Sequence, residues 1–463
     1  MILVGRMQLE YMVDGTPCNI ADEPGLQCYA TRRECCRADA ALLTTGQDIH
    51  DLVARLYPIC RSITGDGVRT TLRLLGEIVP LGLHEIPSGT PIFDWVVPKE
   101  WNVRSAYIAK PNGERIVDFA EHNLHLMSYS VPVSGRFSRD EVLAHVHTLP
   151  EHPRWIPYRT SYYREAWAFC TRHADLARFD AAEYEVRIDT SLTDGSMTYG
   201  ELYLPGKRED EVLFFSHVCH PSLANDNLSG IAVTAYLARS LMRADREFSY
   251  RFVWAPGTIG SIAWLATRPE VLPKVRHGLV AVLLGDSGVF QYKGTRFGNA
   301  PIDRICRRAV ARRGGIHLPF EPYGYDERQF ASPGVALPVG RLTRSPNGGF
   351  PEYHTSADDL TLVRPDKLAE ALDVLREIVD AVEHDDRYVN LSPNCEPQLG
   401  KRGLYRSTGG TELPERQLAL LWLLNRSDGD HSLVDIAEES GIELVIIRSA
   451  AQELVASGLL KER

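Results

Sequence analysis

Short apolar runs alternate with segments of helical periodicity through the central part of the chain, and this alternation predicts the fold. Runs rich in β-branched, aromatic and aliphatic residues suit buried strands; they are residues 184–188, 198–204, 211–215 and 279–284. Apolar positions at helical spacing mark amphipathic helices at 302–312 and 366–384. We therefore expect an α/β fold, in which a mostly parallel mixed sheet is flanked by helices on both faces.

Changes in composition and hydrophobic periodicity along the sequence divide the chain into domains. Residues 1–44 have few periodic apolar positions and predict a poorly ordered leader. Residues 88–134 consist of short alternating runs broken by turn residues, which predicts an inserted β-rich domain. The α/β domain then takes residues 45–87 and 135–400. We expect the insert to be either a structural element or a contact surface of a homo-oligomer.

The C-terminal segment, residues 412–463, follows a linker that bears glycine and proline. An apolar helix at 416–424 precedes a helix, turn and helix at 432–457, and the pattern is that of a winged-helix domain. The segment holds ten acidic residues against five lysines and arginines. This charge has the wrong sign for contact with phosphates, so we expect a protein-interaction or lid module rather than a DNA reader.

Composition narrows the functional class. The chain is 44% hydrophobic and 24% charged, as globular proteins are, and its formal net charge is −10. A negative surface argues against nucleic acid and anionic membranes as partners. Nine scattered cysteines without a Cys-x-x-Cys pair favour free thiols, and no signal peptide or membrane span is evident. We expect a cytoplasmic protein.

Candidate metal ligands lie where predicted strands end. His217 follows the apolar run 211–215, and Asp226 lies close to the start of the next helix. Asp286 follows the run 279–284, and His354 is accompanied by nearby carboxylates. Open α/β sheets bind their ligands at the carboxyl edge. Together these four side chains form a nitrogen and oxygen set that suits Zn²⁺.

The segment 217–230, with its core Ala-Asn-Asp-Asn-Leu-Ser-Gly, resembles the first metal-binding segment of the co-catalytic zinc aminopeptidases. From about residue 46 onward, the chain is similar to a bacterial aminopeptidase-like family of largely unknown function, which joins this domain to a β-rich insert and a C-terminal winged helix. The matching segments include residues 93–102, 158–163 and 353–356. The resemblance implies one metal held by His217, Asp286 and a bridging Asp226, and a second position to which Asp226 and His354 contribute.

The chain departs from the aminopeptidase pattern at two points. The family carries a Glu-Glu pair, which supplies the general base and a ligand, where this chain has Gly257 and Thr258. It carries an aspartate two residues after the first histidine, where this chain has Cys219. These departures favour one Zn²⁺ over two, and they require a proton carrier from elsewhere.

Residues 323–329 offer such a carrier. A hydrolytic metal site needs a base within reach of the bound water, and we favour Glu327, with Asp326 next. His220 is a further ligand, a proton shuttle or a substrate contact. Tyr353 or Arg344 could hold an oxyanion or a substrate carboxylate.

The sequence thus predicts a zinc-dependent hydrolase that cleaves an amide bond of a small peptide or an amino-acid conjugate. Two alternatives remain open. The first is a specialised small-molecule amidase or acyl-transfer enzyme of a biosynthetic pathway. The second is a binding or scaffold protein that kept the fold but lost turnover together with the Glu-Glu pair.

Overall fold

The computed structural model describes residues 12–13, 16–17, 44–404 and 414–463. The first two pairs form the short strands β1 (Met12–Val13) and β2 (Thr16–Pro17). Apart from these two pairs and Thr44, the expected leader, residues 1–44, lies outside the described residues. Residues 45–463 belong to one compact unit, and all further statements concern its described part.

The centre of this unit is an eight-stranded mixed sheet, with strand order β17-β16-β18-β15-β13-β14-β12-β3. Its strands are β3 (Gly82–Pro87), β12 (Ser196–Leu204), β13 (Glu211–His217), β14 (Ser249–Ala255), β15 (Val275–Ala281), β16 (Gln291–Lys293), β17 (Ile316–Leu318) and β18 (Val339–Thr343). The central strands β14, β13, β15 and β18 pair in parallel. Antiparallel pairs join β12 to β3 and β14, and β16 to β18. The α/β fold class that the sequence predicts is confirmed.

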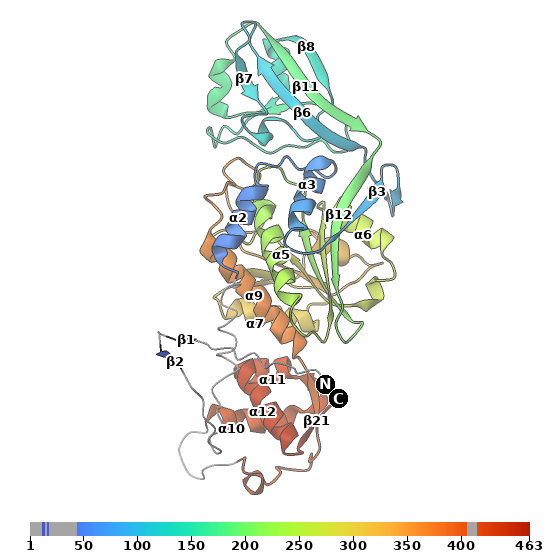
Figure 1. The fold of residues 1–463 in the computed structure, drawn as a ribbon, viewed down its shortest axis with the longest axis vertical. Helices are drawn as coiled ribbons and strands as arrows, with labels where there is room; N and C mark the ends of the chain where they lie inside the picture. Colours follow the sequence, from blue (N-terminus) through green and yellow to red (C-terminus); the bar gives the residue numbers. More distant parts are fainter. Residues whose placement is uncertain (1–11, 14–15, 18–43, 405–413) are drawn as a thin grey trace, which may run out of the picture. The chain divides into compact units, whose positions relative to one another are not determined.

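Helices cover both faces of the sheet because side chains alternate along its strands. Phe214 of β13 packs into one hydrophobic core and its neighbour Phe215 into another. The first core receives α2 (Gly46–Leu56), α3 (Asp66–Leu75), α5 (Gly230–Leu241), α7 (Pro301–Ala311) and α9 (Pro365–Glu383). The second receives α6 (Ile259–Thr267) and α8 (Glu327–Phe330). Figure 1 shows α2, α5 and α9 side by side on one face. No helix in the described part of the chain has the length and apolar character needed to cross a membrane.

The inserted domain is built on a four-stranded antiparallel sheet of order β7-β6-β11-β8. Its main elements are β6 (Glu100–Ala109), β7 (Arg115–Asp118), β8 (Val133–Ser138), α4 (Arg139–Ala144) and β11 (Glu183–Thr193). Two small sheets accompany it, β4 (Pro91–Ile92) with β5 (Trp95–Val96), and β9 (Val146–His147) with β10 (Phe169–Cys170). The sheet extends past the expected limit at residue 134, because β11 pairs with both β6 and β8. Strand β11 then leads almost directly into β12 of the central sheet (Figure 1).

The C-terminal domain consists of β19 (Arg387–Asn390), α10 (Glu415–Arg426), β20 (Asp428–Ser432), α11 (Leu433–Ser440), α12 (Leu444–Ala456) and β21 (Leu460–Glu462). Its sheet has the order β20-β19-β21, so it begins before the expected start at residue 412. Helix α11 packs against α7: Arg304 forms an ion pair of 2.5 Å with Asp435, and Arg308 donates to the carbonyl oxygens of Ala437 and Ile442. Acidic residues of this domain therefore pair with arginines of the same chain.

Candidate metal centre

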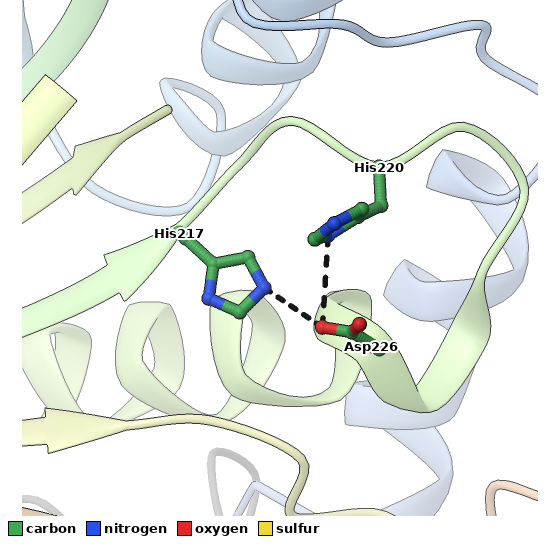
Figure 2. A group of neighbouring side chains, drawn as sticks. All are labelled: His217, His220 and Asp226. Carbon is green, nitrogen blue, oxygen red and sulfur yellow. Dashed lines mark hydrogen bonds and ion pairs between the residues drawn. The ribbon is translucent and has the colours of Figure 1, made fainter. Parts of the chain in front are cut away.

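Three candidate ligands gather at the end of strand β13. His217 is its last residue, His220 lies in the turn that follows, and Asp226 lies in the kinked turn η4 (Ala224–Ser229) before α5. Nε2 of His217 is 2.8 Å from Oδ1 of Asp226, and Nδ1 of His220 is 3.6 Å from the same oxygen. Figure 2 shows both imidazoles turned toward this carboxylate. The ligand atoms of the three residues all lie within 4.8 Å of one another.

A third imidazole reaches the same carboxylate from a distant part of the chain. His354 lies in the loop between β18 and α9, and its Nε2 is 3.0 Å from Oδ2 of Asp226. Its ring centroid is 5.0 Å from that of His220. The structure therefore brings together three of the four expected ligands, His217, Asp226 and His354, and places His220 with them.

Asp358 holds the turn that carries Asp226. It is buried, and its carboxylate accepts hydrogen bonds from the backbone N–H groups of Asn225 at 2.6 Å and Asp226 at 2.9 Å. Its carbonyl oxygen accepts from the N–H of Ala224 at 2.9 Å. Because three consecutive residues of the turn are fixed by one side chain and its backbone, the direction of the Asp226 carboxylate is set before any ligand binds.

The electrostatics of the cluster suit metal binding, which requires neutral imidazoles and an ionised carboxylate. Burial lowers the pKa of His220 to about 3, so this ring is neutral near pH 7. Burial alone would raise the pKa of Asp226, but the nearby imidazoles of His220, His217 and His354 bring it well below its usual value. Asp226 and His220 are thus in the protonation states that a cation needs.

The donor set fits Zn²⁺ in its chemistry. Three imidazole nitrogens and one carboxylate are among the commonest zinc ligands. Asp226 is completely buried, and within the described residues its ion-pair partners are histidines only, with no lysine or arginine. A buried carboxylate is stabilised by a strong cationic partner. A divalent cation among these four side chains would supply that partner.

Asp286, the fourth expected ligand, does not join this cluster. Its Oδ2 accepts from the side-chain amide of Asn225 at 2.8 Å. Its Oδ1 accepts from the N–H of Gly288 at 2.6 Å and from the hydroxyl of Ser345 at 2.8 Å. Within the described residues, no hydrogen bond or ion pair joins this carboxylate to His217, Asp226 or His354. The role of Asp286 as a direct ligand stays a prediction, and its position also suits a residue that holds Asn225.

The two candidate bases occupy different environments. Glu327 is buried and forms ion pairs with Lys293 at 2.6 Å and Arg341 at 3.5 Å, and it does not line the cavity at the metal centre. Asp326 does line that cavity, and its Oδ1 accepts from the N–H of Thr258 at 2.7 Å and the hydroxyl of Ser261 at 2.6 Å. Burial raises the pKa of Asp326. These environments favour Asp326 over Glu327 as the base, and the assignment of either residue stays a prediction.

Of the other expected site residues, Tyr353 lines the cavity and Arg344 does not. Tyr353 stacks on His354 with ring centroids 4.0 Å apart. Arg344 is buried elsewhere, where it donates to backbone carbonyls of Leu284 and Gly288 and pairs with Glu370, so its expected role in substrate binding is not supported by its position. Burial raises the pKa of the Cys219 thiol to about 12, and its sulfur accepts from a backbone N–H, as a structural cysteine does.

A cavity of about 440 Å³ opens over the cluster. Its wall is rich in tyrosine and includes two arginines. The lining residues include His217, His220, His354, Tyr158, Arg159, Tyr162, Tyr325, Asp326, Arg328, Asn347 and Tyr353. Tyr325 stacks on His217, and Tyr158 contacts the rings of both His220 and His354 edge-on.

Arg159 and Arg328 were absent from the sequence-based site. Arg159 lies between the insert strands β9 and β10, and an isolated bridge joins the nearby Pro157 to Thr355 beside His354. The sequence offers no signal for this long-range contact of the Arg159 segment. Arg328 could have been proposed from the sequence, because it lies in the same segment as Asp326.

Comparison with known proteins supports this architecture. Residues 50–385 match the model of a domain of unknown function, DUF4910, and residues 386–462 match a winged helix-turn-helix model. A Clostridium acetobutylicum protein is 48% identical over 420 residues, which cover 90% of this chain and 96% of that protein. Its name describes a candidate polysaccharide biosynthesis protein with an aminopeptidase-like domain.

Solved structures also share the fold of this chain. The crystal structure of a candidate peptidase from Clostridium acetobutylicum aligns with TM-score 0.86 and 44% identity, covering 93% of this chain and 99% of the other. A zinc aminopeptidase from Bacillus subtilis aligns with TM-score 0.54 and 13% identity over 74% of this chain and 96% of its own, which shows a shared fold. The chain belongs to the DUF4910 family, with an aminopeptidase-like α/β domain and a C-terminal winged helix.

Proposed function

We propose that this protein is a zinc-dependent hydrolase that cleaves an amide bond of a small peptide or an amino-acid conjugate. The observation that carries the proposal is the convergence of His217, His220 and His354 on the buried carboxylate of Asp226, beneath an open cavity. The aminopeptidase-like fold supports it, because ligands of open α/β sheets bind at the carboxyl ends of the strands, where His217 lies.

The proposed chemistry divides between the ion and the protein. Zn²⁺ held by the three histidines and Asp226 would polarise the amide carbonyl and make a bound water acidic. Asp326 would accept the proton of that water and return it to the leaving amine. The hydrogen bonds from Thr258 and Ser261 both fall on its Oδ1, so among the described residues no hydrogen bond occupies Oδ2.

Tyr353 would stabilise the oxyanion that forms on the carbonyl oxygen. Its ring is fixed by stacking on His354, and burial raises the pKa of its hydroxyl, which keeps the proton in place as a donor. The residues at the Glu-Glu position of zinc aminopeptidases cannot act as general base or carboxylate ligand here, because Gly257 has no side chain and the Thr258 side chain carries no carboxylate.

A second candidate function is a specialised amidase or acyl-transfer enzyme of a biosynthetic pathway. The name of the Clostridium acetobutylicum relative, with its reference to polysaccharide biosynthesis, favours this candidate. The two candidates share the metal centre and differ in the substrate, so the same assay can distinguish them.

The experiment measures amine release by the zinc-loaded full-length protein from two sets of substrates, aminoacyl anilides with dipeptides, and N-acylated amino sugars. The proposal expects turnover of the first set that is lost in Asp226→Ala and Asp326→Asn and kept in Asp286→Asn. Turnover of the second set alone would establish the specialised amidase. Zinc binding without release of amine from either set would contradict both and leave a binding protein.

A further inference from the structure

The cavity over the metal centre contains two arginines to which the proposed chemistry assigns no role. Arg159 and Arg328 both line it. Within residues 44–404 and 414–463 neither guanidinium forms an ion pair with a carboxylate, whereas Arg251, Arg341 and Arg344 are all paired with glutamates. A guanidinium that lies beside a cavity without a carboxylate partner can recognise an anion.

Arg328 is the more enclosed of the two. It is partly buried, and its Nε has no hydrogen-bond partner among the described residues. Its Nη2 is 3.4 Å from the hydroxyl of Thr258, which ties the guanidinium to the loop next to Gly257. A Cβ atom added at Gly257 would lie 3.6 Å from Cβ of His217, so this loop runs beside the metal ligands.

Arg159 reaches the cavity from a different segment. It directly follows Tyr158, whose ring lies 5.3 Å from that of His220 and 5.1 Å from that of His354. A second cavity, of about 290 Å³, shares Arg159, Tyr158, Tyr353 and His354 with the first. Arg159 therefore stands where the two spaces meet, and a ligand at the metal centre that extends between them passes its side chain.

The charges of the cavity wall favour an anionic ligand. Asp326 is the only carboxylate among the lining residues of the larger cavity, and it is engaged by Thr258 and Ser261. With Zn²⁺ bound to Asp226 and the histidines, positive charge would exceed negative charge around the substrate. Such a site attracts an acidic ligand and repels a basic one.

We propose that Arg159 and Arg328 bind an anionic group of the substrate, a carboxylate or a phosphate, so that acidic conjugates are bound in preference to neutral or basic peptides. This inference rests on the proposed function for the identity of the bond that is cleaved. The anion site itself rests only on the two arginines and the cavity.

The test is isothermal titration of the zinc-loaded full-length protein with three probes of similar size. These are N-benzoylglycine, its neutral amide, and phenyl phosphate. We expect an anionic probe to bind about tenfold or more tightly than the amide, as hydrogen bonds to charged groups provide. Preference for N-benzoylglycine or for phenyl phosphate identifies the anion as a carboxylate or a phosphate.

Variants show whether the arginines cause this preference. Arg159→Gln and Arg328→Gln should each reduce it severalfold, and Arg328→Lys should retain part of it. Arg136→Gln is the matched control, because Arg136 is exposed on β8 and does not line the cavity. Equal binding of all three probes, or an anion preference unchanged in both glutamine variants, would overturn the inference.

The same measurements separate this inference from the proposed function. Binding of the probes requires no turnover, so an arginine-dependent preference in a protein that releases no amine would leave the anion site standing and remove the hydrolase. Efficient cleavage of neutral substrates, with kcat/KM unaffected by Arg159→Gln and Arg328→Gln, would do the reverse.

Discussion

His354 lies 3.0 Å from Asp226 through its Nε2, although 128 positions of sequence separate the two residues. This contact joins the loop before α9 to the turn before α5, and it closes the cluster that His217 and His220 begin. The buried carboxylate is thereby surrounded by imidazoles from two segments.

Substitution of Asp358 should weaken zinc binding without removing a ligand. Asp358→Ala deletes the acceptor of the N–H groups of Asn225 and Asp226, so the turn that aims Asp226 loses its support. Loss of such a supporting group typically lowers metal affinity about 10–100-fold. Competition with a chromophoric chelator measures this affinity. The control is Asp359→Asn, because the Asp359 carboxylate accepts hydrogen bonds from Thr361 within its own turn; equal affinity in both variants would contradict the prediction.

The two neighbouring acids should give opposite phenotypes. Asp326→Asn should lower kcat about 100-fold or more with little effect on the free energy of unfolding, as expected for a proton carrier. Glu327→Gln should lower the free energy of unfolding by roughly 3 kcal/mol, because it leaves Lys293 buried without its closest charged partner. Urea unfolding and amine-release kinetics measure the two effects. A Glu327→Gln protein of normal stability and no activity would restore Glu327 as the base.

Stability should depend on pH through His277, which is remote from the metal centre. Burial lowers its pKa to about 4, with Arg208, Arg276 and Arg304 opposing and Asp210 favouring its charged form. The folded state therefore binds fewer protons than the unfolded state. Its stabilising contribution is complete above pH ~6.5 and is lost as the pH falls toward 4, by at most about 1.4 kcal/mol per pH unit.

His277→Phe should flatten this acid sensitivity. The measurement is the thermal midpoint between pH 7.5 and pH 5, compared with that of His384→Phe, in which a half-buried histidine beside Asp380 is replaced. A pH profile of His277→Phe that is the same as that of the wild type would show that another group titrates in this window.

The winged-helix domain should not retain duplex DNA at physiological salt. Its acidic residues pair with arginines of the same chain, and the contacts of Arg308 with Ala437 and Ile442 hold α11 against α7. Non-specific binding requires lysines and arginines that face phosphates. Electrophoretic mobility shifts at about 150 mM salt provide the measurement, and micromolar binding that weakens as salt rises would contradict the prediction.

Much of the α/β architecture can be predicted from the sequence, because local patterns of apolar residues identify its strands and helices. The apolar run before His217 identifies a central strand, and its end identifies the edge at which ligands gather. The position at a strand end does not fix the direction of a side chain, however. Asp286 lies at the same edge as His217, yet its carboxylate accepts hydrogen bonds from Asn225 and Ser345.

Charge pairs and long-range contacts account for the remaining differences. Glu327 is adjacent to Asp326 in sequence, but helix α8 turns it toward Lys293 and Arg341 in the interior. Arg159 reaches the cavity because the insert folds back on the loop of His354. Periodicity and composition predict neither the burial of Glu327 nor the position of Arg159, since both depend on which segments meet in three dimensions.

The central claim is that His217, His220, Asp226 and His354 hold one zinc ion. The most direct measurement is anomalous scattering at the zinc edge from crystals of protein loaded with one equivalent of Zn²⁺. We expect a single peak within ligand distance of these four side chains, which disappears in Asp226→Ala. A peak at Asp286, or no peak beside Asp226 in the wild-type protein, would contradict the metal centre and the hydrolase built on it.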